Sequence, residues 1–453
     1  MENSLRQYID LYRANGEELD SRSAPVINAL RPEACRRLEE MELPAAGSED
    51  YEVTDLSALL GHDYGLNVRR VPLAVDPAES FRCGVPRMST ALFMLVNDRF
   101  GRIGESTAAL PAGVEVCGLA DMARRCPEAV ADHYGRLADM GNPVVALSTL
   151  LAQDGVWIRI PAGVRVERPI QLVEILGGAD NLMAVRRVVI VAESRSEVKI
   201  LVCDHTLPSA RDMMALQTVE IFAGEGSHIE LYDLEESSES TRRLSSLWLR
   251  QDKDSHVTLN GMTIYNGMTR NEYHTVFAAP GSRLQLYGMG IADRERMIDT
   301  YSHVDHQHGH CHTEELFKFS VDDKARCAFT GLVKVAHGAE KTEAYQSNRN
   351  LIGSHEARMH SKPQLEIYND DVKCSHGSAT GRLDEMQLFY MRTRGLDEAE
   401  ARLLLKQAFM ADVIDKVAIP GLRERLIHMV ERRFAGESAG CHDCHSECPG
   451  LHG

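Results

Sequence analysis

The sequence has no long hydrophobic run. Its 453 residues contain no stretch of about 18 uninterrupted apolar residues, which argues against a membrane-spanning helix. The opening segment MENSLRQYIDLYRANGEELD has neither a basic start nor an apolar stretch, so it does not predict a signal peptide. We therefore expect a cytoplasmic protein, in which the 11 cysteines are reduced.

The sequence also lacks an excess of positive charge. It has 50 Lys and Arg residues against 67 Asp and Glu residues, which gives a net charge of −17. Nucleic-acid-binding proteins display a basic surface, and an anionic membrane repels a protein of this charge. Both classes of function are therefore disfavoured, whereas a basic protein partner or a metal cation is electrostatically favourable.

Motifs for nucleotide binding and hydrolysis are missing as well. There is no GxxxxGK[ST] loop and no strand–GxGxxG–helix unit, so the chain is not expected to bind ATP itself. No GxSxG motif or pair of carboxylates marks a hydrolase, and the acidic residues are dispersed. We therefore expect a protein that is not an enzyme.

The most informative segment is residues 370–395, DDVKCSHGSATGRLDEMQLFYMRTRG. In an extended strand, Cys374 and His376 point to the same side, where sulfur and nitrogen can bind one ion. Thiolate and imidazole suit iron, zinc or an iron–sulfur cluster better than magnesium or calcium. The alternative is a structural pair, since a buried cysteine is usually a small apolar residue.

Short period-two segments between residues 114 and 380 predict a β-rich core. A small residue precedes two apolar residues at spacing two, at intervals of 31, 28, 27 and 43 residues. These segments begin at Ser196, Ser227, Ser255, Ser282 and Ala325. Recurrence at this period is typical of a solenoid, so a β-helix is favoured and a β-sandwich is the alternative. The longest interval predicts an insertion, DTYSHVDHQHGHCH.

Helical patterns flank this core. We expect an N-terminal helical region over residues 1–113, the β-helix core over 114–380, a C-terminal helical region over 381–435 and a flexible tail over 436–453. In the C-terminal region, Asp397 and Glu400 form a capping box. An apolar stripe then includes Ala401, Leu404, Leu405, Ala408 and Phe409. Leu404, Leu405 and Phe409 are candidates for contact with a partner protein.

Two further segments have the residue types of metal ligands. His306, His308 and His310 would share one side if their segment is a strand, and imidazoles bind divalent metals. Cys441, Cys444 and Cys448 in the tail have zinc or cluster spacing. The alternatives are a solvated loop that binds metal adventitiously and a tail that scavenges metal weakly.

The sequence NRNLIGSHEARMHSKPQLEIYNDDVKCSHGSATGRLDEMQLFYMRTRG, followed by EARLLLKQAF, resembles the SufB/SufD family of iron–sulfur cluster assembly proteins. The resemblance implies a mainly β fold, with a right-handed parallel β-helix core between helical regions. It also implies a scaffold subunit that pairs with SufB through the β-helix and binds the ABC-type ATPase SufC through its C-terminal helices. Sulfur would come indirectly from a cysteine desulfurase system.

The resemblance gives His376, with Cys374 beside it, a role at the interface with SufB. No cofactor would be permanently bound there, and iron or an iron–sulfur cluster would be shared transiently with the partner. SufB-like chains have Glu where this chain has Gly377, and HEARMHSKP lacks their acceptor cysteine, so the SufD branch is favoured. The alternatives are a homodimer in isolation and a stand-alone iron or zinc chaperone that uses the His-rich segment and the Cys-rich tail.

Overall fold

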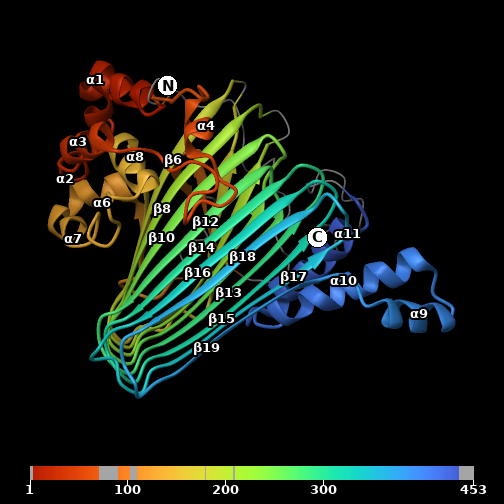
Figure 1. The fold of residues 1–453 in the computed structure, drawn as a ribbon. Coiled ribbons are helices and arrows are strands. Elements are labelled where there is room, and N and C mark those ends of the chain that lie inside the picture. Colours follow the sequence, from red (N-terminus) through yellow and green to blue (C-terminus); the bar gives the residue numbers. More distant parts are fainter. Residues whose placement is uncertain (1–3, 71–89, 103–109, 179, 208–209, 438–453) are drawn as a thin grey trace, which may run out of the picture.

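The protein is a parallel β-solenoid flanked by helices at both ends of the chain (Figure 1). The computed structural model describes residues 4–70, 90–102, 110–178, 180–207 and 210–437. Along the solenoid, successive strands alternate between two sheets, and each strand pairs in parallel with the strand two elements away. The prediction of a mainly β fold with a parallel β-helix core and helical flanks is confirmed.

The two sheets contain the odd-numbered and the even-numbered strands of the solenoid. The odd-numbered sheet, to which β2 is added antiparallel, contains β1 (Ala91–Val96), β2 (Arg99–Arg102), β5 (Ile170–Leu176), β7 (Glu197–Thr206), β9 (His228–Glu236), β11 (His256–Tyr265), β13 (Arg283–Ala292), β15 (His312–Val321), β17 (Glu343–Ile352) and β19 (Lys373–Gly381). The even-numbered sheet, to which β3 is added antiparallel, contains β3 (Glu115–Gly118), β4 (Gly155–Ile160), β6 (Leu182–Ala192), β8 (Met213–Ala223), β10 (Thr241–Gln251), β12 (Met268–Phe277), β14 (Met297–His306), β16 (Arg326–Val335) and β18 (Arg358–Ile367).

The small residues of the sequence repeat mark the start of strands. Ser196, Ser227, Ser255 and Ser282 directly precede β7, β9, β11 and β13, all in the odd-numbered sheet. Ala325 instead precedes β16 in the even-numbered sheet. The predicted insertion is therefore wrong: its residues form part of β14, a turn and the start of β15. Strands of both sheets have the same alternating pattern. The longest interval, from Ser282 to Ala325, therefore runs from the start of a strand in one sheet to the start of a strand in the other sheet.

Helices of the N-terminal half lie against the even-numbered sheet (Figure 1). They are α1 (Arg6–Ser21), α2 (Pro25–Asn28), α3 (Arg31–Glu40), α4 (Leu56–Gly61), α6 (Leu119–Arg125), α7 (Pro127–Ala131) and α8 (Pro143–Leu151). Asn142 caps α8 by accepting hydrogen bonds from the backbone N–H groups of Val144 and Val145. The expected boundary at residue 113 does not separate helices from strands, because β1 and β2 precede it and α6 to α8 follow it.

Helices of the C-terminal region are α9 (Glu385–Thr393), α10 (Glu398–Ile414) and α11 (Pro420–Phe434). The side chain of Asp397 caps α10 by accepting a 2.8 Å hydrogen bond from the N–H of Glu400, as predicted. The apolar face of α10 differs from the predicted stripe, because Leu404 and Ala408 are exposed. The residues buried on α10 are Ala401, Met410, Val413 and Ile414, and the last three pack with α11 on the odd-numbered sheet. No helix in the described ranges is long and apolar enough to span a membrane.

Candidate functional site

The last coil of the solenoid is open at its end. Among the described strands, β19 pairs only with β17 and β18 pairs only with β16, so each is the outermost strand of its sheet. No described coil stacks beyond β18 and β19, so their inward-pointing side chains are uncovered on that side. Most residues of β19 are exposed. An unpaired edge leaves backbone N–H and C=O groups free to bond with another strand.

Cys374 and His376 lie on the inner face of this open coil. Their register partners on β17 are Ala344 and Gln346, both of which are buried inside the solenoid. Since neighbouring residues of parallel strands point to the same side, Cys374 and His376 point inward as well. Register therefore confirms that the two side chains share one face, and it adds that this face continues the interior of the solenoid.

The two side chains differ in their surroundings. Cys374 is half-buried against the apolar core, and this burial raises the pKa of its thiol, although a hydrogen bond from the backbone of Ala344 opposes the shift. The thiol is therefore protonated near neutral pH, and a bound cation must favour the thiolate before Cys374 can act as a ligand. The ring of His376 is exposed and forms no hydrogen bond or ion pair with another described residue.

Polar side chains continue the inner face beyond the cysteine and the histidine. Asn348 Oδ1 accepts hydrogen bonds of 2.7 Å from both Asn350 Nδ2 and Ser361 Oγ. Ser361 Oγ in turn lies 2.7 Å from Ser378 Oγ, which joins β18 to β19 across the interior. Thr380 Oγ1 accepts a 3.0 Å bond from Asn350 Nδ2. The interior of the open coil is thus polar, and hydrogen bonds between side chains connect β17, β18 and β19.

The charged residues next to the pair interact with other side chains. Asp371 lies 2.6 Å from Lys341 Nζ, and Lys373 Nζ lies 2.9 Å from Glu343 Oε1. These pairs are exposed, and the side chain of Lys373 alternates to the face opposite Cys374. They secure the turn and the strand edge but do not contact the thiol directly.

The structure separates the three histidines predicted to share a strand face. His306 ends β14 and is fully buried, with Nε2 2.9 Å from Thr313 Oγ1 and its ring stacked on Phe277. Burial lowers the pKa of His306 to about 3, so the ring is neutral. His308 and His310 lie exposed in the following turn. Within the described part of the chain, no three His, Cys, Asp or Glu residues are grouped to hold a metal ion. Cys441, Cys444 and Cys448 lie outside the described residues.

The interior of the first coils contains buried charges that sequence reasoning missed. Arg186 Nη1 lies 2.8 Å from Glu174 Oε2 and 2.5 Å from Asp204 Oδ1. Arg243 lies 2.9 Å from Asp204 and 2.6 Å from Asp233. Burial, reinforced by the nearby charge of Asp204, raises the pKa of Glu174 to about 8 against the pull of Arg186. The only sequence signal was the presence of charged residues at inward-facing positions of the period-two pattern.

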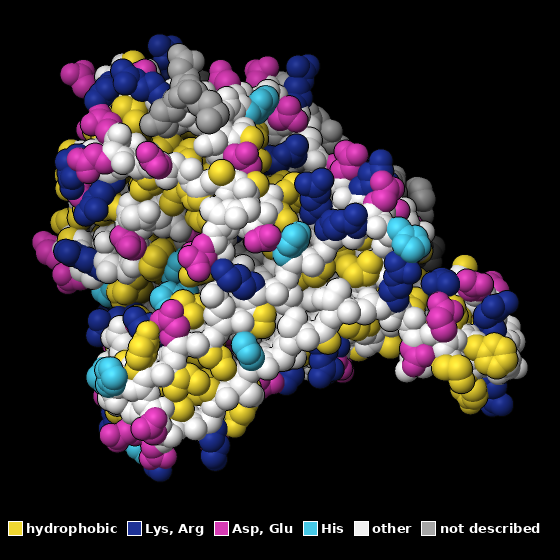
Figure 2. Space-filling view, viewed as in Figure 1, with side chains coloured by type: hydrophobic (Ala, Val, Ile, Leu, Met, Phe, Trp, Pro, Cys, Tyr) yellow, Lys and Arg dark blue, Asp and Glu magenta, His cyan; other side chains and the backbone are white. Residues whose placement is uncertain are grey.

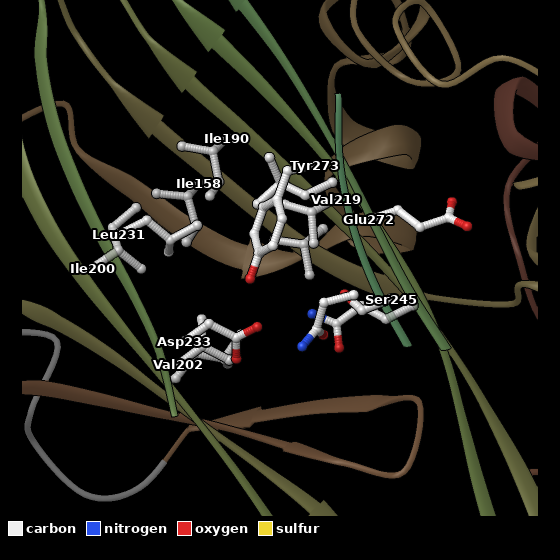
Figure 3. Close-up of a pocket in the computed structure, with 15 residues that line it drawn as sticks. Ile158, Ile190, Ile200, Val202, Val219, Leu231, Asp233, Ser245, Glu272 and Tyr273 are labelled. Carbon is white, nitrogen blue, oxygen red and sulfur yellow. The ribbon is translucent and has the colours of Figure 1, made fainter. Parts of the chain in front are cut away.

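A small cavity lies beside this network. Its volume is about 20 Å³, roughly enough for one water molecule. Figure 3 shows Asp233 and Ser245 near one side of the cavity and Ile158, Ile190 and Leu231 near the other, while the carboxylate of Glu272 points away. The cavity is too small for an organic substrate, so this part of the interior is packed core and not a binding site for such a molecule.

The C-terminal helices present an apolar surface to solvent. The exposed fractions are 74% for Met386, 62% for Phe389, 62% for Tyr390 and 40% for Leu404. Figure 2 shows hydrophobic side chains gathered over the projecting α9. Leu405 is half-buried, and Phe409 is turned toward the solenoid, where Lys318 Nζ lies 4.6 Å from its ring centroid. Of the predicted partner residues, Leu404 is therefore the most accessible, and the three residues of α9 were missed although MQLFYM is conspicuously apolar.

These features define a class of protein: a parallel β-solenoid with an open, thiol- and imidazole-bearing end and an exposed helical extension. The family model for the SUF system FeS cluster assembly SufBD core domain matches residues 175–409, and the model for the SufBD protein N-terminal region matches residues 2–172. The chain belongs to the SufBD family of iron–sulfur cluster assembly proteins. The family resemblance found in the sequence is confirmed.

Similar proteins of known family cover most of the chain. An iron–sulfur cluster assembly SufBD family protein of Synechocystis is 28% identical over 89% of this chain and 90% of its own length. The iron–sulfur cluster assembly protein SufD of Escherichia coli is 26% identical over 96% of this chain and 97% of its own length. SufD of Bacillus subtilis is 27% identical over 64% of this chain and 67% of its own length.

Proposed function

We propose that this chain is the SufD-type scaffold subunit of a SUF complex, in which it pairs with a SufB-type subunit and a SufC-type ATPase. Iron or a nascent iron–sulfur cluster binds transiently at Cys374 and His376, where the two scaffold subunits meet. One observation carries the proposal: Cys374 and His376 lie on the inner face of a coil whose two strands, β18 and β19, have no described strand paired to their outer edges.

The open end favours another solenoid as the partner. A strand that pairs with β18 or β19 satisfies free backbone groups and extends the sheet. Apolar side chains near this end are also exposed, with fractions of 43% for Ile367 and 49% for Tyr368. Burying such side chains stabilises an interface, and pairing of two open ends covers both apolar surfaces at once.

The ligand set of the open coil is incomplete within one chain. Iron–sulfur clusters and structural zinc sites commonly use four protein ligands, whereas the inner face of this coil presents one thiol and one imidazole. A second subunit that covers the open end can supply the missing ligands and exclude water. A metal cation bound between the two subunits also favours the thiolate of Cys374, which burial disfavours.

The apolar surface of α9 and α10 supports a second partner. Aromatic side chains exposed in a group are typical of protein interfaces, and Phe389 and Tyr390 are exposed with Met386 on α9, while Leu404 is exposed on α10. The surface lies on a projecting helix apart from the open coil (Figure 1). The ATPase can therefore bind there while the scaffold subunits pair elsewhere. No described residue supports the alternative of a stand-alone metal chaperone, because the histidines are separated.

The test uses a cell that depends on this system for cluster assembly, with the chain co-expressed with its SufB-type and SufC-type partners. We expect His376→Ala to abolish cluster maturation while the three proteins still co-purify. His308→Ala is the matched control, because it removes another exposed histidine. Normal maturation with His376→Ala, or failure of the three proteins to co-purify before any substitution, contradicts the proposal.

A further inference from the structure

A column of three side chains leads from the interior of the solenoid to His376. Glu315 on β15 is in register with Gln346 on β17, and Gln346 is in register with His376 on β19. Neighbouring strands are about 4.8 Å apart, so each side chain of the column lies directly beside the next. Glu315 and Gln346 are buried, whereas His376 is exposed at the open end.

The amide of Gln346 is held in a fixed orientation. Its Nε2 donates a 2.9 Å hydrogen bond to Glu315 Oε2, and the same carboxylate oxygen accepts a 3.0 Å bond from Ser302 Oγ. Gly331 on β16 leaves the space that the amide occupies: a Cβ atom at this position would lie 2.4 Å from Gln346 Nε2 and 2.9 Å from Gln346 Cδ. Two neighbours therefore define where the amide lies.

The oxygen of this amide has no hydrogen-bond donor. Gln346 Oε1 is buried and unpaired among the described residues. A buried acceptor without a hydrogen bond lowers the stability of the fold. Such an acceptor in a native structure is therefore a candidate for a functional role. With Nε2 committed to Glu315, the remaining neighbour of Gln346 in the column is His376, whose ring nitrogens have no hydrogen-bond partner among the described residues.

We propose that Gln346 is a positioning residue for His376: its Oε1 accepts the N–H of one ring nitrogen, so that the other nitrogen is directed at iron or a cluster. This inference rests on the proposed function. A ligating histidine generally donates its second ring N–H to an acceptor, which fixes both the tautomer and the orientation of the ring. Glu315 acts one step further away by fixing the amide, and Gly331 acts by leaving room for it.

The first measurement is anaerobic Fe²⁺ binding to the purified three-protein complex. Loss of a residue that orients a ligating histidine typically weakens metal binding about 10-fold to 100-fold. We expect a weakening of this size for Gln346→Leu. Gly331→Ala, which keeps every polar group but displaces the amide, is expected to weaken binding in the same direction.

The matched control is Gln217→Leu. Gln217 on β8 is also buried in the interior with an unpaired Oε1, but it lies in the coils far from the open end. Its substitution is expected to leave Fe²⁺ affinity unchanged. If Gln217→Leu weakens binding as much as Gln346→Leu, the effect reflects general loss of interior packing, and the positioning role is refuted.

A second readout needs no iron. In the metal-free complex labelled with ¹⁵N-histidine, we expect the His376 ring to occupy one tautomer, and Gln346→Leu to produce a mixture. The signal is identified by its loss in His376→Ala. If His376→Ala itself leaves Fe²⁺ affinity unchanged, the proposed function fails. If His376→Ala weakens binding but Gln346→Leu alters neither affinity nor tautomer, only the role of Gln346 fails.

Discussion

Replacing Arg186 by Met tests how the first coils tolerate buried charge. Arg186 is fully buried, and its Nη1 contacts both Glu174 and Asp204, while its Nε donates to the backbone oxygen of Asn97 at 2.9 Å. Asp204 keeps Arg243 as a partner after the substitution. Glu174 is left as a buried carboxyl group without its basic partner, and the backbone oxygen of Asn97 loses its donor. Because the pKa of Glu174 is about 8, its carboxyl group is protonated once Arg186 is gone, and the cost is that of two buried groups left without a hydrogen-bond partner. Each such group costs about 1–3 kcal/mol, so we expect a loss of about 2–5 kcal/mol.

The assay is equilibrium unfolding in urea, with the change in stability taken from the midpoint when the slope is unchanged. The double variant Arg186→Met with Glu174→Leu also removes the carboxyl group that has lost its partner. It is expected to be more stable than Arg186→Met, because replacing both partners by apolar groups is far less costly than removing one. A loss below about 1 kcal/mol, the size expected of a surface ion pair, would refute the reasoning, as would a double variant no more stable than the single one.

Three further predictions concern the edge, the helices and the interior. Ser378→Pro is expected to block pairing with the SufB-type subunit, because the backbone N–H at this position points away from β17 and proline removes that donor; co-purification measures this. Phe389→Ser is expected to weaken binding of the ATPase by about 2 kcal/mol, measured by calorimetry. Glu315→Gln is expected to make the fall in stability with rising pH shallower. Burial raises the pKa of Glu315 to about 7, so the folded state holds a proton that the unfolded state releases at lower pH.

Each of these predictions has its own control. Ser378→Ala removes the same hydroxyl without proline, so equal loss of pairing in both variants rules out the edge as the cause. Ile427→Ser alters an exposed apolar residue on α11, with an exposed fraction of 45%, and is expected to spare ATPase binding. For Glu315, unfolding is followed between pH 5 and 8, and an unchanged pH slope after Glu315→Gln shows that another carboxyl is responsible.

Much of the fold could be predicted because its pattern is local. Ser196, Ser227, Ser255 and Ser282 begin strands at a nearly constant interval, and alternation within each strand identifies the buried face. The sheet to which a strand belongs is not local information, and Ala325 was therefore assigned to the wrong series. The exposed side of α10 was also not predictable from its own pattern, because packing on the solenoid selected Met410 and Val413 rather than Leu404.

The candidate site was predictable only in part. The spacing of Cys374 and His376 in a strand predicts a shared side, but not whether that side faces solvent or the interior. That depends on pairing with β17, which places Gln346 beside His376 across a separation of 30 residues in the chain. The buried charges of Arg186 and Glu174 escaped prediction for a similar reason: each residue is compatible with the interior only because the other is there.

The central claim is that the open coil is the surface on which a second scaffold subunit binds. Hydrogen–deuterium exchange of this chain, with and without its SufB-type partner, tests that claim most directly. We predict that amides of β18 and β19, those of His376 and Ser378 among them, become protected when the partner is added, while amides of β8 and β10 are unchanged. Protection confined to other surfaces, with β18 and β19 exchanging as fast as in the free chain, would contradict the claim.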